Sequence, residues 1–312
     1  MIIAYANDIP HDIARAFSLV RPAALRTVNP IASTWKLRKT KLEFGANPKL
    51  MGILNVTPDS FSDGGVFFST QLAIDRALQM EDDGADILDI GGESTRPFSE
   101  PVSLEDEISR VLPVLAGLQG RLGIPISIDT TKSQVAAAAV DLGAEIINDI
   151  SGLEFDPEML DVAMRTQVGV CAMHIQGTPK TMQENPHYSD VVEEVRDYLS
   201  RRDRSLISSG IDPSRICLDP GIGFGKSHQH NLALLQRIDA FHALERPLLV
   251  GHSRKGFIAK IIDDKQADRM PGSIGVSLAM AMKRIQILRI HDVLATKQAL
   301  LLFQAAGGLP RP

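Results

Sequence analysis

The chain has 312 residues, of which 44% are hydrophobic, and it carries a formal net charge of −5. This length and apolar content suit one large catalytic domain with an extension, and the acidic balance argues against nucleic-acid or anionic-membrane binding. The first seventeen residues include Asp8, His11, Asp12 and Arg15, so they lack the apolar core of a signal peptide, and no apolar run approaches the ~18 residues of a membrane span. We therefore expect a cytoplasmic protein.

Residues 1–48 follow a different pattern from the rest of the chain. A short helix is predicted over His11–Phe17, and extended segments are predicted over Thr34–Leu37 and Lys41–Phe44. Apolar and polar residues alternate in both segments, which indicates a hairpin with one buried face and its basic side chains in solvent. We expect this hairpin to close the bottom of a domain formed by residues 49–312.

From residue 49 onward, short apolar runs alternate with helical stretches, and most runs end on a polar or ionisable residue. Such runs need both faces buried, as in a parallel sheet, and helices supply the crossovers between parallel strands. Eight such pairs predict an α/β fold, the (β/α)8 or TIM barrel. The predicted strands are 51–54, 87–90, 126–128, 146–147, 168–173, 216–218, 248–250 and 287–288.

Nucleotide-binding, hydrolase and zinc motifs are incomplete in the sequence. The segment Gly225–Ser227 ends like a P-loop, but Pro220 stands where the first glycine is required. The segment 251–255 imitates the nucleophile elbow of serine hydrolases until Lys255 takes the place of the last glycine. The histidines lack zinc-ligand spacing, and both cysteines lie inside predicted strands, where we expect them to be reduced and buried.

The polar residues at the strand ends fall into two chemical groups. Asp129, Asn148 and Asp219 can accept hydrogen bonds, and such acceptors in a dry site suit a flat, amidine-like edge such as an aminopyrimidinone. The other group is cationic or able to become so, which suits a phosphate or diphosphate. Because barrel strands direct their carboxyl ends to one face, we expect a shared cavity; ion pairs that close on themselves are the alternative. The second group is Arg96, Lys255, Arg289 and His291.

Eight motifs lie between about Trp35 and Ala306: MGILNVTPDSFSDGG (51–65), GGESTRP (91–97), IDT (128–130), NDI (148–150), MHIQG (173–177), LDPGIGFGK (218–226), GHSRK (251–255) and RIHDV (289–293). Together they resemble the motifs of dihydropteroate synthases. The resemblance implies a (β/α)8 transferase, usually a homodimer, that uses Mg2+. It joins 6-hydroxymethyl-7,8-dihydropterin diphosphate to 4-aminobenzoate in folate biosynthesis, releases pyrophosphate, and is a target of sulfonamides.

By this resemblance, the pterin is held by residues at the strand ends. Asp219 and Asn148 would bind the aminopyrimidinone edge, and Lys255 would reach the ring carbonyl and a ring nitrogen. Asp129 would lie near the ring where positive charge develops. The apolar walls would come from Ile150, Met173 and Phe224.

The resemblance also implies how the diphosphate departs. Asn55 would help to place the metal and the diphosphate, while Arg96, Arg289 and His291 would neutralise the leaving pyrophosphate. The carbon–oxygen bond would break first, so electrostatic stabilisation would dominate catalysis. The expected catalytic residues are therefore Asp129, Lys255, Arg289, His291 and Arg96.

Two loops, 57–68 and 94–103, would close over the site and keep water from the reacting cation. The chain departs from common members at two points. Gly256 stands where many relatives carry serine, so the aminobenzoate carboxylate would lose a hydroxyl partner, and Phe98–Ser99 replace a frequent Gly-Ala pair. The aminobenzoate pocket would be formed by Thr95, Pro97, Phe224, Lys255 and Gly256.

Two other classes share part of this pattern. A pterin-binding methyltransferase would share the barrel and the pterin contacts, but it has no reason to keep Arg96, Arg289 and His291 as a diphosphate clamp. A non-catalytic pterin-binding paralogue would be expected to lose loop residues such as Asn55 before the pterin pocket. Because all four residues are present, both classes are disfavoured.

Overall fold

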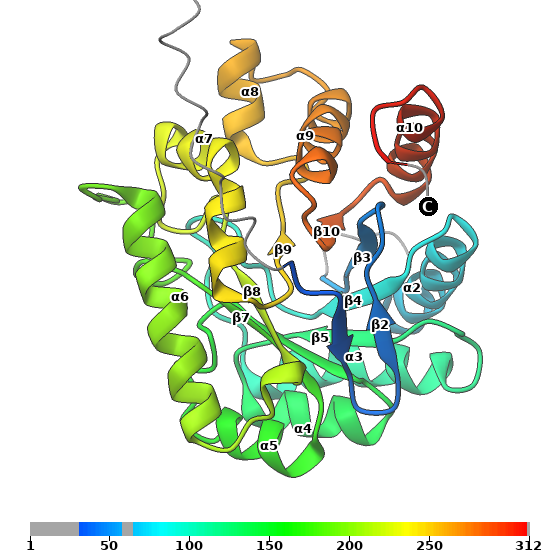
Figure 1. The fold of residues 1–312 in the computed structure, drawn as a ribbon. Helices are drawn as coiled ribbons and strands as arrows, with labels where there is room; N and C mark the ends of the chain where they lie inside the picture. Colours follow the sequence, from blue (N-terminus) through cyan, green and yellow to red (C-terminus); the bar gives the residue numbers. More distant parts are fainter. Residues whose placement is uncertain (1–30, 58–64, 311–312) are drawn as a thin grey trace, which may run out of the picture. The chain divides into compact units, whose positions relative to one another are not determined.

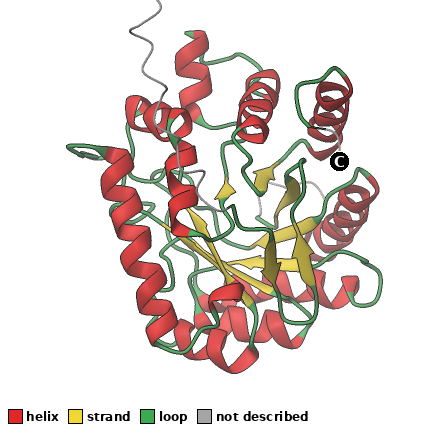
Figure 2. Cartoon of the chain, viewed as in Figure 1, coloured by secondary structure: helices red, strands yellow, loops and turns green. Residues whose placement is uncertain are grey.

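A computed structural model describes residues 31–57 and 65–310. Within these ranges, eight parallel strands form a barrel surrounded by helices (Figures 1 and 2), so the predicted (β/α)8 fold is confirmed. The strand order is β8-β7-β6-β5-β4-β3-β10-β9, and a parallel bridge between Leu218 and Leu248 joins its two ends. The strands are β3 (Lys49–Asn55), β4 (Ile87–Gly91), β5 (Ile126–Asp129), β6 (Ile146–Asp149), β7 (Gly169–Met173), β8 (Ile216–Asp219), β9 (Leu249–Val250) and β10 (Ile287–Ile290).

Helices follow the strands and cover the outside of the barrel (Figure 2). Their amino ends show ordinary capping chemistry: Ser103 Oγ accepts from Asp106 N at one helix, and Asp190 Oδ1 accepts from Val192 N at another. No described helix is long and apolar enough to cross a membrane. The helices are α2 (Gly65–Asp82), α3 (Leu104–Leu118), α4 (Ser133–Asp141), α5 (Met159–Thr166), α6 (Val191–Ser208), α7 (His228–Gln236), α8 (Gly256–Ile262), α9 (Met270–Met282) and α10 (Val293–Ala305), with short 3-10 helices η3 (Pro213–Arg215) and η4 (Ile238–Leu244).

The strands are buried on both faces, as a sheet covered by helices requires. One set of strand residues packs against the helices, and the other set fills the barrel interior. Cys171 and Cys217 are register partners in the interior set; both are free and buried, as predicted.

A two-stranded hairpin packs against the amino ends of the barrel strands. Its strands β1 (Thr34–Lys36) and β2 (Lys41–Glu43) are antiparallel, and Trp35 and Leu42 are register partners on the buried face. Trp35 is fully buried and donates from Nε1 to the Arg215 carbonyl oxygen at 2.8 Å. The predicted extended segments therefore form a hairpin, whereas the division of the chain at residue 48 stays a prediction and the predicted helix 11–17 lies outside the described residues.

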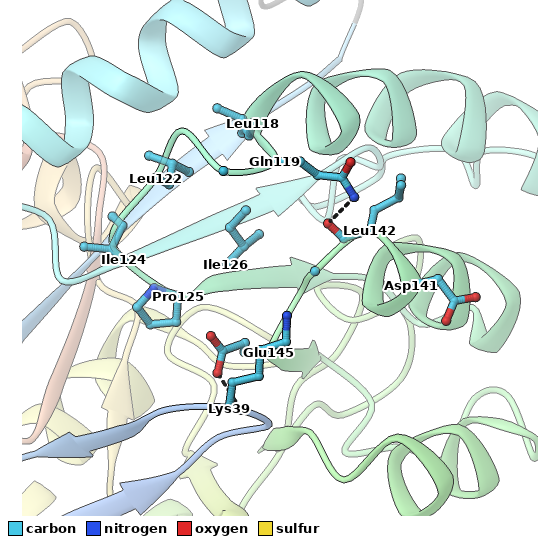
Figure 3. Close-up of a pocket in the computed structure, with 12 residues that line it drawn as sticks. Lys39, Leu118, Gln119, Leu122, Ile124, Pro125, Ile126, Asp141, Leu142 and Glu145 are labelled. Carbon is cyan, nitrogen blue, oxygen red and sulfur yellow. Dashed lines mark hydrogen bonds between the residues drawn. The ribbon is translucent and has the colours of Figure 1, made fainter.

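A cavity of about 370 Å3 lies beside this hairpin, lined by loops that enter β5 and β6 (Figure 3). Glu145 is already paired there, because its carboxylate accepts from the backbone N–H groups of Lys39 and Thr40 at 2.9 Å. The cavity is at the amino end of the strands and contains none of the predicted site residues. Barrel enzymes use the opposite end.

Candidate active site

Strand ends at the carboxyl face bring acidic, amide and cationic side chains into direct contact. Arg289 on β10 donates from Nε to Asp89 Oδ2 on β4 and from Nη2 to Asp129 Oδ2 on β5, both at 2.6 Å. Asn148 on β6 donates from Nδ2 to the same Asp89 oxygen at 3.2 Å. These four residues form one connected network, so the predicted acceptor and cationic groups meet in a single place. For Arg289, the ion pairs named as the alternative are also present, because it is bonded to two carboxylates.

The network perturbs the acidity of its members. Burial raises the pKa of Asp129 to about 7; Arg289 opposes this shift, and the neighbouring charge of Asp89 adds to it. Burial alone would lower the pKa of Arg289, but Asp89 and Asp129 raise it above its ordinary value. Arg289 therefore remains charged, while Asp129 can exchange a proton near neutral pH.

Lys255 and Asp219 form a second charged group at the carboxyl ends of the barrel strands, the region called the mouth of the barrel below. Burial lowers the pKa of Lys255 to about 7, against the opposing effect of Asp219. Lys255 Nζ lies 4.4 Å from the centre of the Phe224 ring, a cation–π contact, and donates to the Ile222 carbonyl oxygen. Asp219 is buried with a raised pKa, and its Oδ1 accepts from Gly221 N at 2.7 Å.

The turn after β8 depends on glycine. Gly221 has φ +69°, and a Cβ atom there would overlap the His174 carbonyl. A side chain at this position would push the turn away from β7 and displace the N–H that binds Asp219. The glycine thus keeps the Asp219 carboxylate fixed at the mouth.

An apolar cluster borders these polar groups. Ile150, Met173 and Phe224, the three predicted wall residues, pack together with Met182 and the partly buried Ile175. Such a surface suits the face of a flat ring system. The sequence did not single out Met182, which belongs to the turn after β7 rather than to a strand.

His291 follows β10, and Arg96 belongs to the loop after β4. Burial lowers the pKa of His291 to about 4, with further lowering by Arg289, Arg254 and Arg96. His291 is therefore neutral at physiological pH in this state, and its Nδ1 lies 3.0 Å from Ser253 Oγ. The Arg96 side chain is exposed.

The loop 94–103 is docked onto the turn that follows β7. Phe98 donates its backbone N–H to the Pro179 carbonyl oxygen at 3.0 Å, and Glu100 forms an exposed ion pair with Lys180. Phe98 has φ +64°, a left-handed conformation in which glycine is easier to accommodate, and its side chain is 66% exposed. Phe98, which stands in place of a frequent glycine, therefore adopts a backbone conformation that glycine would adopt more easily.

Known proteins match this chain over most of its length. The pterin-binding enzyme family model matches residues 51–291. A dihydropteroate synthase of Neisseria meningitidis serogroup B is 47% identical over 274 residues, which cover 86% of this chain and 96% of that protein. The chain belongs to the dihydropteroate synthase family.

Solved dihydropteroate synthase structures share the fold. One from Xanthomonas albilineans with 4-aminobenzoic acid has a TM-score of 0.82 and 40% identity, covering 89% of this chain and all of that one. One from Yersinia pestis, described as a sulfonamide drug complex, has a TM-score of 0.81 and 39% identity, covering 88% and 98%. The dihydropteroate synthase barrel therefore extends over nearly all the described residues.

In this dihydropteroate synthase family member, some of the predicted site residues are in direct contact and others are related only by their position on the barrel. Asp129, Asn148 and Arg289 touch through the network, while Lys255 and Asp219 influence one another by charge. The other predicted residues lie at the ends of strands or in the loops that follow them, except Gly256, which begins α8. Residues 58–64 of the predicted lid lie outside the described ranges. These others are Asn55, Thr95, Arg96, Pro97, Ile150, Met173, Phe224, Gly256 and His291.

Two buried charged residues of this family member were missed in the sequence. Asp89 is fully buried and links Asn148 to Arg289. The sequence feature that could have revealed it is a carboxylate inside an apolar run. Lys226, also buried, donates to the Phe224 carbonyl oxygen at 2.8 Å and lies 2.9 Å from His174 Nδ1. In the sequence, Lys226 was placed in an incomplete P-loop and at the end of the motif 218–226, without a role of its own.

Proposed function

We propose that this chain condenses 6-hydroxymethyl-7,8-dihydropterin diphosphate with 4-aminobenzoate to give 7,8-dihydropteroate and pyrophosphate, a step in folate synthesis. The observation that carries this proposal is the bonding of Arg289 to both Asp89 and Asp129. It brings a diphosphate-binding cation beside the acceptors suited to a pterin, so one site can serve both parts of the substrate. Family membership and the named ligand of the Xanthomonas relative support the same reaction.

The pterin half would be bound by Asn148, Asp219 and Lys255. Because Asn148 Nδ2 is committed to Asp89, its Oδ1 is left to accept from a ring N–H. The Asp219 carboxylate can accept from the neighbouring amino group, and Lys255 can donate to the ring carbonyl. Asp129 would face the ring and stabilise positive charge as the carbon–oxygen bond breaks.

The diphosphate half would be bound by Arg96, Arg289 and His291. The planar guanidinium of Arg289 suits bidentate contact with phosphate oxygens, and Arg96 is exposed at the rim where it can close over them. Before the substrate binds, His291 would be a neutral hydrogen-bonding group, and the bound diphosphate would make it cationic. Together they would stabilise the leaving pyrophosphate, after which the aminobenzoate nitrogen captures the pterin cation.

The shifted pKa of His291 leads to a test by proton uptake. A bound diphosphate should raise that pKa from about 4, so binding should take up a proton between the free and bound pKa values, and affinity should rise as pH falls through that range. Calorimetry of pyrophosphate binding in two buffers of different ionisation enthalpy measures the uptake. His291→Gln should remove this contribution; equal uptake by both proteins would show that His291 does not respond to the anion.

Mg2+ would accompany the diphosphate, with Asn55 as the protein ligand. This ion is often held by one or two protein oxygens together with substrate phosphates and water. Asn55 ends β3 beside Gly91 and offers one amide oxygen, and the described residues contain no cluster of three His, Cys, Asp or Glu able to hold an ion without substrate. When bound, the ion would neutralise part of the diphosphate charge.

Aminobenzoate would bind between Phe224, Lys255 and the loop carrying Thr95 and Pro97. A Cβ atom at Gly256 would meet nothing within 4 Å, so the serine common in relatives would fit and its absence removes only a hydroxyl donor. Sulfonamides imitate aminobenzoate and should compete with it; steady-state inhibition at several aminobenzoate concentrations measures this. Purely noncompetitive inhibition would reject the pocket.

A homodimer is also part of the proposal. Leu294 and Leu301, seven residues apart on α10, are 49% and 51% exposed, and Leu302 is 72% exposed. Residues seven apart share one face of a helix, so this apolar face would be covered by a second copy, which sedimentation velocity can detect. The cytoplasmic location expected from the sequence remains a prediction.

The reaction itself can be tested by measuring pyrophosphate formation with each component omitted in turn. Rapid formation should require the pterin diphosphate, aminobenzoate and Mg2+ together. Formation that does not depend on aminobenzoate would indicate hydrolysis of the diphosphate instead of condensation. Formation of the dihydropteroate product, followed by mass spectrometry, should parallel the formation of pyrophosphate.

A further inference from the structure

Two acidic side chains flank the loop 94–103, and both contact one lysine. Glu93 directly precedes the loop, and Glu107 lies in the first turn of α3 just after it. Lys132 Nζ is paired with Glu93 Oε2 and lies 2.6 Å from Glu107 Oε2. A single ammonium group therefore joins the two stems of the loop.

The two stems are also packed tightly against each other. The Glu107 side chain is fully buried, and the Lys132 ammonium is its ionic partner. A Cβ atom at Gly92 would lie only 2.8 Å from Val111 Cγ1, and Arg110 Nη1 donates to the Gly92 carbonyl oxygen at 2.8 Å. Helix α3 is thus pressed against the end of β4, and movement of either stem disturbs the ion pairs.

Lys132 also connects this loop to the catalytic mouth. It belongs to the short segment between β5 and α4, and the last residue of β5 is Asp129, the register partner of Gly91. Glu107 is close enough to raise the pKa of Asp129. The ammonium therefore lies between the loop stems and the strand that carries a site carboxylate.

We propose that Lys132 is a positioning residue that clamps both stems of the loop 94–103 to the Asp129 end of β5, so that Thr95 and Pro97 are held in place for aminobenzoate. This inference rests on the proposed function, because it assigns the loop to that substrate. Lys132 makes no contact with the reacting atoms in this account. Its loss should impair aminobenzoate binding and capture, while the pterin contacts of Asn148 and Asp219 on other strands persist.

The test uses Lys132→Met, Lys132→Arg and a matched control, Lys49→Met. Lys49 forms a comparable partly buried ion pair with Asp86 at 2.9 Å, but it does so at the amino end of β3. In Lys132→Met, hydrogen exchange of the amides in 94–103 should become faster. The KM for aminobenzoate should rise roughly tenfold or more because misplaced binding groups lose effective alignment.

The remaining measurements and variants distinguish a positioning role of Lys132 from a general loss of structure. Pterin diphosphate affinity, measured by calorimetry, should change by less than about threefold in Lys132→Met, a change near the lower end of what one hydrogen bond contributes. Lys132→Arg should restore most of the aminobenzoate KM, and Lys49→Met should leave both the KM and the loop exchange unchanged. If Lys132→Met fails to fold, Glu93→Gln removes one arm of the clamp and should show the same selective effect in smaller degree.

Unchanged exchange in 94–103 in the folded variants would overturn the clamp. Faster exchange with an unchanged aminobenzoate KM would overturn the proposal too, because the clamped loop would then not serve that substrate. Failure of the proposed function is distinguishable, since the unmodified chain would then show no aminobenzoate-dependent release of pyrophosphate.

Discussion

Replacing Arg289 with alanine should slow pyrophosphate release about a hundredfold or more, because one well-aimed electrostatic donor at a developing charge is worth roughly 2.7 to 4 kcal/mol. The side chain bonds Asp89 and Asp129 at 2.6 Å, so its removal also leaves two buried carboxylates without their cation. We therefore expect a stability loss of about 3 to 5 kcal/mol as well. Single-turnover assays and denaturant unfolding measure the two effects separately.

Arg246→Ala is the matched control for Arg289→Ala. Arg246 forms a partly buried ion pair with Asp203 at 2.9 Å and precedes β9 at the amino end of the barrel. It should lower stability and leave turnover of the folded enzyme unchanged. Near-normal turnover of folded Arg289→Ala would contradict the diphosphate role.

Asp219→Asn should weaken pterin binding by about 1.5 to 3 kcal/mol, because the substitution removes a charge-assisted hydrogen bond from a buried site. Asp219 is only 5% exposed, and Gly221 N holds one carboxylate oxygen at 2.7 Å, so the other is free to face the ring. The uncharged amide keeps the shape and can still accept from Gly221. Calorimetry with a pterin ligand measures the loss of affinity.

Asp149→Asn provides the comparison for Asp219→Asn. Asp149 is another buried aspartate at a strand end, but its Oδ1 accepts from Ser151 N at 2.7 Å and from Ser151 Oγ at 2.6 Å. Its Oδ1 is therefore engaged in the turn after β6, and its Oδ2 is buried with no hydrogen-bond partner among the described residues. Pterin affinity should stay unchanged in Asp149→Asn, and equal losses in the two variants would refute the specific assignment of Asp219.

Much of the barrel could be predicted because each strand is an apolar run with an abrupt polar end. The run 126–128 became β5 with Asp129 as its last residue, and the run 216–218 became β8 with Asp219 as its last residue. Both faces of such strands are buried, so composition alone marks them. Once the fold is a barrel, these ends must converge on one face.

The pairing among the polar residues could not be predicted in the same way. Asp89 looked like an interruption of a strand, and only the neighbouring positions of β4, β6 and β10 reveal that it holds Asn148 and Arg289 together. The neutral state of His291 likewise arises from burial and nearby arginines, which sequence spacing does not encode. Met182 and Lys132 lie in loops, where periodic patterns carry no information about contacts.

The central claim is that one cavity binds a bicyclic ring through acceptors and its diphosphate through cations. A crystal structure with the dihydropterin diphosphate bound tests this most directly. We expect the ring edge within hydrogen-bonding distance of Asp219 and Asn148, and the phosphate oxygens on Arg289 in the same cavity. A diphosphate bound away from Arg289, or a ring bound away from Asp219, would contradict the account.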